Sequence, residues 1–409
     1  MSPFHHLIPL FLTLITPVFG AQSYKALVAP ITQTGPSSSP FTITLNQNEN
    51  LIIDIESPFS WHHCSKGFPR VPCRAPQCSS AQSNKSPSCR LPRPWNRPYR
   101  PCTCSTSPFN PFTKTCALSQ LSYSSVSITS TDGHTPLTKV KYNKVFMSCA
   151  PKLLLNSLPE NSSGIASLSR GSLSLIPQFS SVKVSQKFGM CLGDQGVAFF
   201  GEGPYYLLPP PGRDVSQFLS YTPLLKNPKD ALGYYIGLKG ISVNLQAVKL
   251  SPNMLSFDSL GNGGVKLSTV TPYTTMKSNI YGAFFSLFSR TTSKYPRVPK
   301  VAPFDLCFNS TKLGSTRVGY AVPQIDLQLS NGGNWTIFGA NSLMQVSDDV
   351  ACLGFVDGGV KAKQDVVIGS LQMQHNFLLF DLAKSRLGFS SLLFFFQTTC
   401  NNFNFTSGL

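Results

Sequence analysis

The stretch LIIDIESPFSW, residues Leu51–Trp61, carries the pattern on which the interpretation of the whole chain depends. An apolar strand pattern ends in the carboxylate of Asp54, and a turn signal and Trp61 follow it. A second stretch in the C-terminal half, GGVKLSTVTPY at Gly263–Tyr273, has the same outline of an apolar strand followed by a polar turn. In this second stretch Ser268 takes the place that Asp54 has in the first.

Composition limits the class of protein. A chain of 409 residues is long enough for two or more domains with cores of their own, and a content of 41% hydrophobic and 12% charged residues excludes a disordered or coiled-coil chain. The 33 prolines and 30 glycines indicate many turns and mostly β structure. The net charge of +17 favours an acidic partner, such as a cell-wall polyuronide or an acidic protein surface. Nucleic acid is disfavoured because the charge is scattered and no nucleic-acid-binding motif occurs.

The first twenty residues have the features of a secretory signal peptide. The apolar run Leu7–Phe19 is too short to span a bilayer, and a cleavage site follows at Gly20 or Ala21. The abrupt change to a polar sequence after it disfavours a buried N-terminal element. No later stretch is long and apolar enough for a membrane helix, so we expect a secreted, extracellular protein of the apoplast or cell wall.

Cysteines and glycosylation motifs agree with secretion. Twelve cysteines follow the signal segment and predict six disulfides in an oxidising compartment. A zinc site is disfavoured because Cys102 and Cys104 are too close for a zinc-ribbon pair and the nearby histidines lack ligand spacing. We therefore expect no metal and no cofactor. Asn-x-Ser/Thr motifs predict glycosylation at four residues, Asn161, Asn309, Asn334 and Asn404.

The chain between these landmarks alternates short strand patterns with turns. Strands are predicted at Ala26–Ala29, Phe41–Leu45, Leu118–Thr131 and Tyr234–Leu238, a hairpin at Lys187–Phe200, and a closing group at Val366–Ser370, Asn376–Leu382 and Ser385–Ser390. The proline-rich segment Gly201–Gly212 is expected to connect two halves. Ser278 is expected to cap a helix that carries an apolar stripe.

Five further motifs carry a family resemblance: SCAP at Ser148–Pro151, VAPFDLCF at Val301–Phe308, GYAVP at Gly319–Pro323, VACLGFVDGG at Val350–Gly359 and TTCNNFNFT at Thr398–Thr406. With them the chain resembles, from about Tyr24 to its end, the plant group of inactivated pepsin-like proteins. That group contains wheat-type xylanase inhibitors, xyloglucan endoglucanase inhibitors, the extracellular dermal glycoprotein of carrot and the legume basic 7S globulins.

The resemblance implies a fold. We expect a mainly β, bilobal pepsin-like aspartic protease fold with short helices, rich in disulfides. The expected division is a signal peptide at 1–20, an N-terminal lobe at 21–205 and a C-terminal lobe at 206–409. Family likeness also implies the disulfides Cys307–Cys352 and Cys191–Cys400 and, less directly, Cys64–Cys149.

The resemblance also implies that the protease chemistry is lost. Active pepsin-like enzymes carry Asp-Thr-Gly in both stretches, and their two carboxylates, about 3 Å apart, share one proton so that one acts as acid and the other as base. Here Ile55 and Glu56 replace the first Thr and Gly, and Ser268 and Val270 replace the second Asp and Gly. The flap turn that active relatives carry in this region is also missing, and the chain has only Ser122–Ser125 there. We therefore predict that the chain is not an enzyme, with Asp54 and Ser268 as degenerate catalytic positions.

In place of protease activity, the resemblance implies that loops of the C-terminal lobe enter the cleft of a glycoside hydrolase. The first loop matches Asn309–Val318, with Lys312, Leu313 and Arg317, and the second matches Leu392–Thr399, with Phe396 and Gln397. Glycosidases have two catalytic carboxylates in a groove, which a cation from the inhibitor could pair with. Arg317 matches the arginine of xyloglucanase inhibitors, but Gln397 stands where they have a second arginine, and the second loop has no histidine like that of the xylanase inhibitors.

Three hypotheses follow. The first is a secreted, non-catalytic inhibitor of a microbial or plant xylanase or xyloglucanase of family 11 or 12, acting in plant defence. The second is a peptide- or polysaccharide-binding wall or storage protein like the basic 7S globulins, which the missing second cation favours. The third, a residual aspartic endopeptidase, is disfavoured by Ser268.

Overall fold

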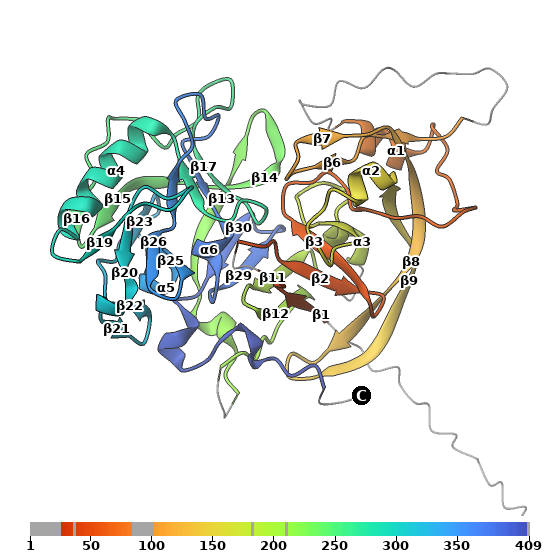
Figure 1. The fold of residues 1–409 in the computed structure, drawn as a ribbon. Coiled ribbons are helices and arrows are strands. Elements are labelled where there is room, and N and C mark those ends of the chain that lie inside the picture. Colours follow the sequence, from red (N-terminus) through yellow and green to blue (C-terminus); the bar gives the residue numbers. More distant parts are fainter. Residues whose placement is uncertain (1–25, 36–37, 84–101, 181–183, 209–211, 407–409) are drawn as a thin grey trace, which may run out of the picture.

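Six antiparallel strands, three from each half of the chain, form the sheet that joins the two lobes. Their order is β1, β12, β11, β29, β30 and β13. The halves meet where β11 pairs with β29, Phe188 opposite Phe380, and the two rings stack with centroids 4.4 Å apart. The structure is a computed structural model that describes residues 26–35, 38–83, 102–180, 184–208 and 212–406, and two lobes flank this shared sheet (Figure 1).

The strands of the N-terminal half are β1 (Ala26–Thr32), β2 (Thr42–Leu45), β3 (Glu49–Asp54), β4 (Trp61–His62), β5 (Ser105–Thr106), β6 (Phe109–Asn110), β7 (Thr115–Cys116), β8 (Ser119–Thr131), β9 (Pro136–Cys149), β10 (Gly164–Ser167), β11 (Lys187–Cys191) and β12 (Gln195–Gly201). Its helices are α1 (Pro76–Ser83), α2 (Lys152–Leu155) and α3 (Leu175–Phe179). The long β8–β9 hairpin curves along the outer side of this lobe (Figure 1).

The strands of the C-terminal half are β13 (Ser220–Asn227), β14 (Asp230–Ile236), β15 (Leu238–Val243), β16 (Gln246–Ala247), β17 (Val265–Leu267), β18 (Thr274–Met276), β19 (Arg297–Val298), β20 (Cys307–Asn309), β21 (Ser315–Thr316), β22 (Gly319–Tyr320), β23 (Ile325–Leu329), β24 (Asn334–Ile337), β25 (Leu343–Ser347), β26 (Val350–Leu353), β27 (Phe355–Asp357), β28 (Val366–Ile368), β29 (Phe377–Asp381) and β30 (Arg386–Phe389). Its helices are α4 (Ser278–Thr291), α5 (Gly339–Ser342), α6 (Ser370–Met373) and the 3-10 turns η1 (Val215–Phe218), η2 (Ser310–Lys312), η3 (Leu393–Phe396) and η4 (Cys400–Asn402).

One apolar cluster extends through both lobes and explains why they form one unit. It runs from the N-terminal strands, with Leu27 and Ile53, across the shared sheet at Phe188 and Phe380, to helix α4 at Phe284. Burial of apolar area is the main favourable term in folding, so a continuous core resists separation of the lobes. The close approach of β11 and β29 also requires a residue without a side chain, because a Cβ on Gly189 would lie 2.5 Å from the ring of Phe377.

Disulfides attach the peripheral segments to this core. Cys191–Cys400 ties the C-terminal tail back to strand β11, and Cys307–Cys352 joins β20 to β26. Cys64–Cys149 joins the segment after β4 to the end of β9, while Cys73–Cys102 and Cys78–Cys104 staple the segment around α1. The first three are the pairs that the resemblance implied. Every cysteine that the structure describes is disulfide-bonded; Cys89 lies outside the described residues.

Two local expectations were wrong. Ser278 does not cap α4: Lys277 is the N-cap, and the Ser278 hydroxyl donates instead to Asp357 at 2.7 Å. The segment Ser122–Ser125 is not at a flap position, because it lies within β8 and pairs with β9. A separate short hairpin, β6–β7, precedes it. The predicted signal segment lies outside the described residues, and no described helix is both long and apolar enough to cross a membrane.

Candidate functional site

Strand register shows that Asp54 and Ser268 occupy equivalent places in the two lobes. In the N-terminal lobe β3 runs parallel to β10, with Ile53 opposite Ala166 and Asp54 opposite Ser167. In the C-terminal lobe β17 runs parallel to β28, with Leu267 opposite Ile368, and the Ser268 amide donates to Ile368. Both strands therefore end at the same point of the same motif, and their loops meet at the junction of the lobes.

Thr269 connects the two loops directly. Its hydroxyl donates to the Ile53 carbonyl at 2.6 Å and accepts from the Ile55 amide at 3.4 Å, so one side chain of the C-terminal lobe bonds the first loop on both sides of Asp54. Ile55 is the equivalent residue of the first loop and has no hydroxyl, so the reciprocal bonds cannot form. Only the contacts made by Thr269 therefore hold the ends of β3 and β17 together, without the symmetric contacts from the first loop.

Asp54 is buried, and one of its carboxylate oxygens accepts hydrogen bonds. The equivalent position of the other lobe carries Ser268 and not a second carboxylate. The Oδ1 of Asp54 accepts from the amides of Glu56 and Ser57 at 2.8 and 3.2 Å. Burial, and after it the negative charge of Glu56, raise the pKa of Asp54 to about 7. On the other side the Ser268 hydroxyl accepts from Thr271 at 3.1 Å.

Glu56, which replaces the first glycine, takes part in an ion network between the lobes. Its Oε2 is 2.5 Å from the Lys266 ammonium, which is also 2.8 Å from Asp230 Oδ2, and the Tyr235 hydroxyl donates to that same oxygen at 2.8 Å. Burial alone would raise the pKa of Asp230, but Lys266 lowers it to about 2. Burial alone would lower the pKa of Lys266, but its two carboxylate partners raise it.

Val270, which replaces the second glycine, fills space at the same junction. It packs against an apolar cluster of the N-terminal lobe that includes Phe59 and Trp61, and Phe112 from the β6–β7 turn packs against the same cluster. An ion network and an apolar side chain therefore occupy the junction around one buried carboxyl. A protease needs two carboxylates and a water between them there. Among the described residues, no group of three or more His, Cys, Asp or Glu side chains could hold a metal ion.

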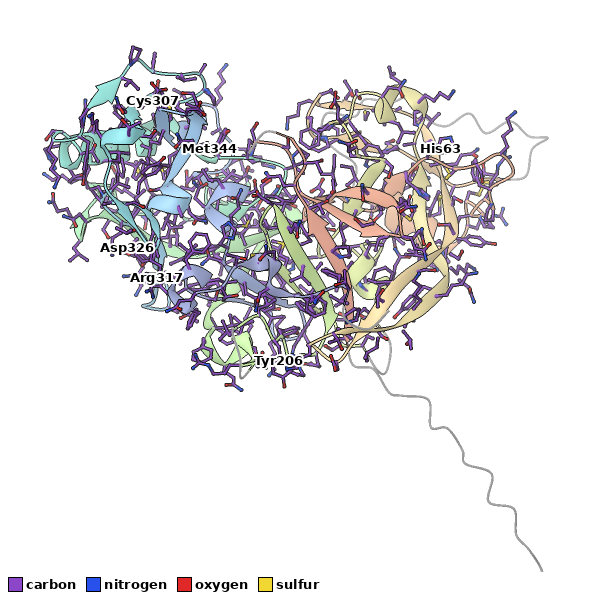
Figure 2. All side chains as sticks on the ribbon, turned by 60° about the horizontal axis from the view of Figure 1, so that its bottom comes forward. His63, Tyr206, Cys307, Arg317, Asp326 and Met344 are labelled. Carbon is purple, nitrogen blue, oxygen red and sulfur yellow. A yellow bond between two sulfur atoms is a disulfide. The ribbon has the colours of Figure 1, made fainter. Side chains whose placement is uncertain are left out.

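The first expected inhibitor loop presents Arg317 at the tip of a hairpin. Arg317, which is exposed, and Val318, which is half-buried, form the turn between β21 and β22. A hydrogen bond from the Thr316 hydroxyl to the Gly319 carbonyl at 2.8 Å fixes this turn. The Arg317 side chain makes no hydrogen bond or ion pair with the residues that the structure describes, and Figure 2 shows it at the surface of the C-terminal lobe. Lys312, in η2, is also exposed.

The second expected loop is held by aromatic contacts. The rings of Phe394, Phe395 and Phe396 lie 4.6 Å from His375, 5.0 Å from Phe338 and 5.5 Å from Phe218, measured between centroids. Gln397 then adopts a left-handed conformation with φ of 56° and is exposed. The loop is therefore a fixed turn whose exposed groups are Phe395 and Gln397.

Helix α5 brings the two loops into one surface. Phe338 at its start packs on Phe395 of the second loop, and the Ala340 amide in its first turn donates to Val318 of the first loop at 2.9 Å. Two residues that were expected in the inhibitor loops are not fully exposed on this surface. Leu313 is buried in the core, since it points inward from η2, and Phe396 is half-buried against Phe218. Sequence reasoning missed Phe338, whose role depends on contacts between segments far apart in the chain.

The register of the two parallel strand pairs and the shared six-stranded sheet define a bilobal, pepsin-like protein. Two family models match the chain: xylanase inhibitor N-terminal at residues 42–202 and xylanase inhibitor C-terminal at residues 233–391. The chain therefore belongs to the plant family of inactivated pepsin-like proteins that these models describe.

Individual relatives agree over nearly the full length. Chitinase CLP from Oryza sativa subsp. japonica is 41% identical, covering 93% of this chain and 92% of the relative. The crystal structure of edgp has a TM-score of 0.85 and 37% identity, and covers 95% of this chain and 100% of the other. That of basic 7S globulin from soybean has a TM-score of 0.77 and 28% identity, and covers 94% of this chain and 100% of the other.

Asp54 should make stability fall as pH rises. Its pKa is about 7 in the folded protein and near 3.8 in an unfolded chain, so the folded state binds more protons between these values. The free energy of unfolding should therefore decrease from about pH 4 to about pH 7. This pH-dependent contribution to the free energy of unfolding is of the order of a few kcal/mol. Asp54→Asn should remove it, which urea unfolding measured at several pH values between about 4 and 7 would show. The exposed Asp348→Asn is the control, and an unchanged slope in Asp54→Asn would contradict the raised pKa of Asp54.

Lys266 should contribute strongly to stability because it neutralises two partly buried carboxylates. Lys266→Met leaves Glu56 and Asp230 without their cation, and breaking a buried pair in this way costs about 3–5 kcal/mol. Lys300→Met removes a cation from an ion pair in which Lys300 is 73% exposed, and should cost less than about 1 kcal/mol. Urea unfolding at pH 7.5 compares the two variants. Equal losses in the free energy of unfolding would show that the inter-lobe ion network stabilises the fold no more than a surface ion pair does.

Proposed function

We propose that the chain is a secreted, non-catalytic inhibitor of cell-wall-degrading glycoside hydrolases. The observation that carries this proposal is Arg317: an exposed cation without a protein partner among the described residues, at the tip of a hairpin beside a second fixed, exposed loop. The family models, which are named for xylanase inhibitors, support the same class of partner.

The chemistry of the target explains why one arginine matters. A glycosidase cleft holds two catalytic carboxylates, and a guanidinium can pair with one of them through two hydrogen bonds. The Arg317 hairpin is narrow, and its backbone is fixed by the bonds within the turn and to Ala340. Little conformational entropy is then lost on binding, which favours affinity. Hydrolases of family 11 or 12 are the proposed targets.

The proposal gives the chain no catalytic role of its own. Asp54 has a serine hydroxyl in place of a second carboxylate, so the shared-proton dyad of an aspartic protease cannot form. The rice relative is named a chitinase, but glycosidic cleavage requires at least one carboxyl that reaches the substrate as a general acid. Asp54 is 5% exposed and Glu56 is bound to Lys266, so neither is presented in that way.

The remaining features of the proposal concern secretion and processing. We expect removal of residues 1–20, a lobe boundary near 205 and 206, and glycans on the sequon asparagines. Asn161, Asn334 and Asn404 are exposed, whereas the Asn309 side chain is half-buried and its Oδ1 accepts from the Thr311 hydroxyl at 2.7 Å. Asn309 is therefore the least accessible of the four.

A second candidate function is a wall or storage protein that binds peptides or polysaccharides. The neutral Gln397 favours it, because the second loop then offers no cation to the second carboxylate of a glycosidase cleft. The likeness to soybean basic 7S globulin agrees with it. The two candidates differ in one measurable respect, since this one predicts no inhibition of any glycoside hydrolase.

Arg317→Ala tests the first candidate. A desolvated arginine–carboxylate pair broken by truncation loses about 2–5 kcal/mol, so the inhibition constant should rise by at least about 30-fold. It is measured against a panel of family 11 and family 12 hydrolases, and Lys249→Ala, an exposed cation outside both loops, is the matched control. Inhibition that survives Arg317→Ala unchanged would contradict the loop mechanism, and no inhibition by the unaltered protein would favour the second candidate.

Gln397→Arg is the complementary test. It should tighten inhibition of a hydrolase that the chain already inhibits, because a second cation then faces the second carboxylate. The left-handed backbone at this position is as accessible to arginine as to glutamine, so the loop should keep its shape. A weaker inhibition constant for this variant would show that the second loop does not enter the cleft.

A further inference from the structure

A pocket on the N-terminal lobe combines aromatic rings and polar groups, and a cation lies against each of two of its rings. It lies between the segment after β4 and strand β8, and its volume is about 390 Å³. This is within the roughly 300–1,000 Å³ of small-molecule sites. Phe68 and Tyr123 contribute the rings, and His63, Ser124 and Asn143 contribute polar groups. Figure 2 shows His63 on the lobe opposite Arg317, so the pocket is separate from the proposed inhibitor loops.

The walls of the pocket are fixed by covalent and backbone bonds. Cys64–Cys149 joins the segment after β4 to strand β9. The same segment returns along β8, where the Ser122 hydroxyl donates to the Pro69 carbonyl at 2.8 Å and the Val71 amide donates to Leu121 at 3.1 Å. The pocket is thus preformed, which reduces the entropy lost when a ligand binds.

Two cations stand over the pocket rings and have no acidic partner among the described residues. The Lys144 ammonium lies 4.9 Å from the centroid of Tyr123, and the Arg70 guanidinium lies 5.6 Å from that of Phe68. Glu49, which lies beside the pocket, is already 2.5 Å from His62. The charges of Lys144 and Arg70 are therefore held in place and available to an anion.

The pocket also contains an unsatisfied hydroxyl. Ser124 Oγ is buried and has no hydrogen-bond partner among the described residues. Because Ser124 Oγ is buried, hydrogen bonds to a ligand come from the exposed polar groups of the pocket. The imidazole of His63 and the amide of Asn143 are exposed at the same pocket.

We propose that this pocket binds an acidic saccharide of the uronate type. A uronate residue offers together a carboxylate for Lys144 or Arg70, hydroxyls for His63 and Asn143, and an apolar ring face for Tyr123. An acidic peptide would satisfy the cations, but its carboxylate side chains offer no flat ring face for Tyr123. The net charge of +17 adds a general attraction for a polyuronide chain.

The test measures binding of an oligogalacturonide to the full-length protein by calorimetry at low salt. Lys144→Met and Tyr123→Ala should each weaken binding by about tenfold, as expected for loss of a charge-assisted bond or of a contact surface. Lys141→Met is the matched control, since it removes the same charge from an exposed position of β9, whereas Lys144 lies over the pocket ring of Tyr123. It should change the dissociation constant less than about twofold.

A second aromatic variant and two competing ligands complete the test of the pocket. Because Tyr123→Ala could alter packing, Tyr123→Phe, which keeps the ring, should bind within about threefold of the unaltered protein. No binding, equal weakening by Lys141→Met and Lys144→Met, equal affinity for a neutral xylo-oligosaccharide, or equal competition by polyglutamate would each overturn the proposal. Inhibition constants toward hydrolases should be unchanged in all these variants, so failure here is distinguishable from failure of the proposed function.

Discussion

The contact of Thr269 with Ile53 and Ile55 is the constraint on which the junction of the two lobes depends. It fixes the end of strand β3 relative to that of β17, and hence the positions of Asp54 and Ser268. The hydrogen bonds are buried, so their loss would leave polar backbone groups unpaired between the lobes. The shared sheet aligns the lobes over a large area, whereas this one hydroxyl sets the local geometry at the former catalytic position.

Around that fixed point, residues that form ion pairs or apolar contacts across the junction stand where active pepsin-like enzymes carry the residues of their catalytic loops. The pKa of the lone buried carboxyl of Asp54 is raised to about 7, because burial and the Glu56 charge both oppose its ionisation. Glu56 is neutralised by Lys266, and Lys266 in turn by Asp230. Val270 adds apolar packing against the N-terminal lobe. Two of the substituted residues thus have a partner across the junction: Lys266 for Glu56, and the apolar cluster of the N-terminal lobe for Val270.

The fold could be predicted from sequence because its landmarks are local and ordered. The strand-carboxylate-turn motif at Asp54 and the equivalent stretch at Ser268 determined the architecture, and the strand at Leu118–Thr131 and the hairpin at Lys187–Phe200 were predicted within a few residues. The Glu56–Lys266–Asp230 network was not predicted, because it depends on side chains from three separated segments. The same holds for the contact of Phe338 with Phe395. Leu313 was misplaced because a loop motif does not show which of its side chains points inward.

The protein keeps a pepsin-like architecture, in which an ion network and apolar packing surround the buried carboxyl of Asp54 at the junction of the lobes. The most direct test measures cleavage of a denatured protein substrate at about pH 4, the range in which aspartic protease dyads work. The unaltered protein and Ser268→Asp are assayed with and without a pepstatin-type inhibitor. We expect no inhibitor-sensitive cleavage by either, because Ile55, Glu56 and Val270 still deform and fill the junction. Inhibitor-sensitive cleavage by the unaltered protein would contradict the loss of protease chemistry.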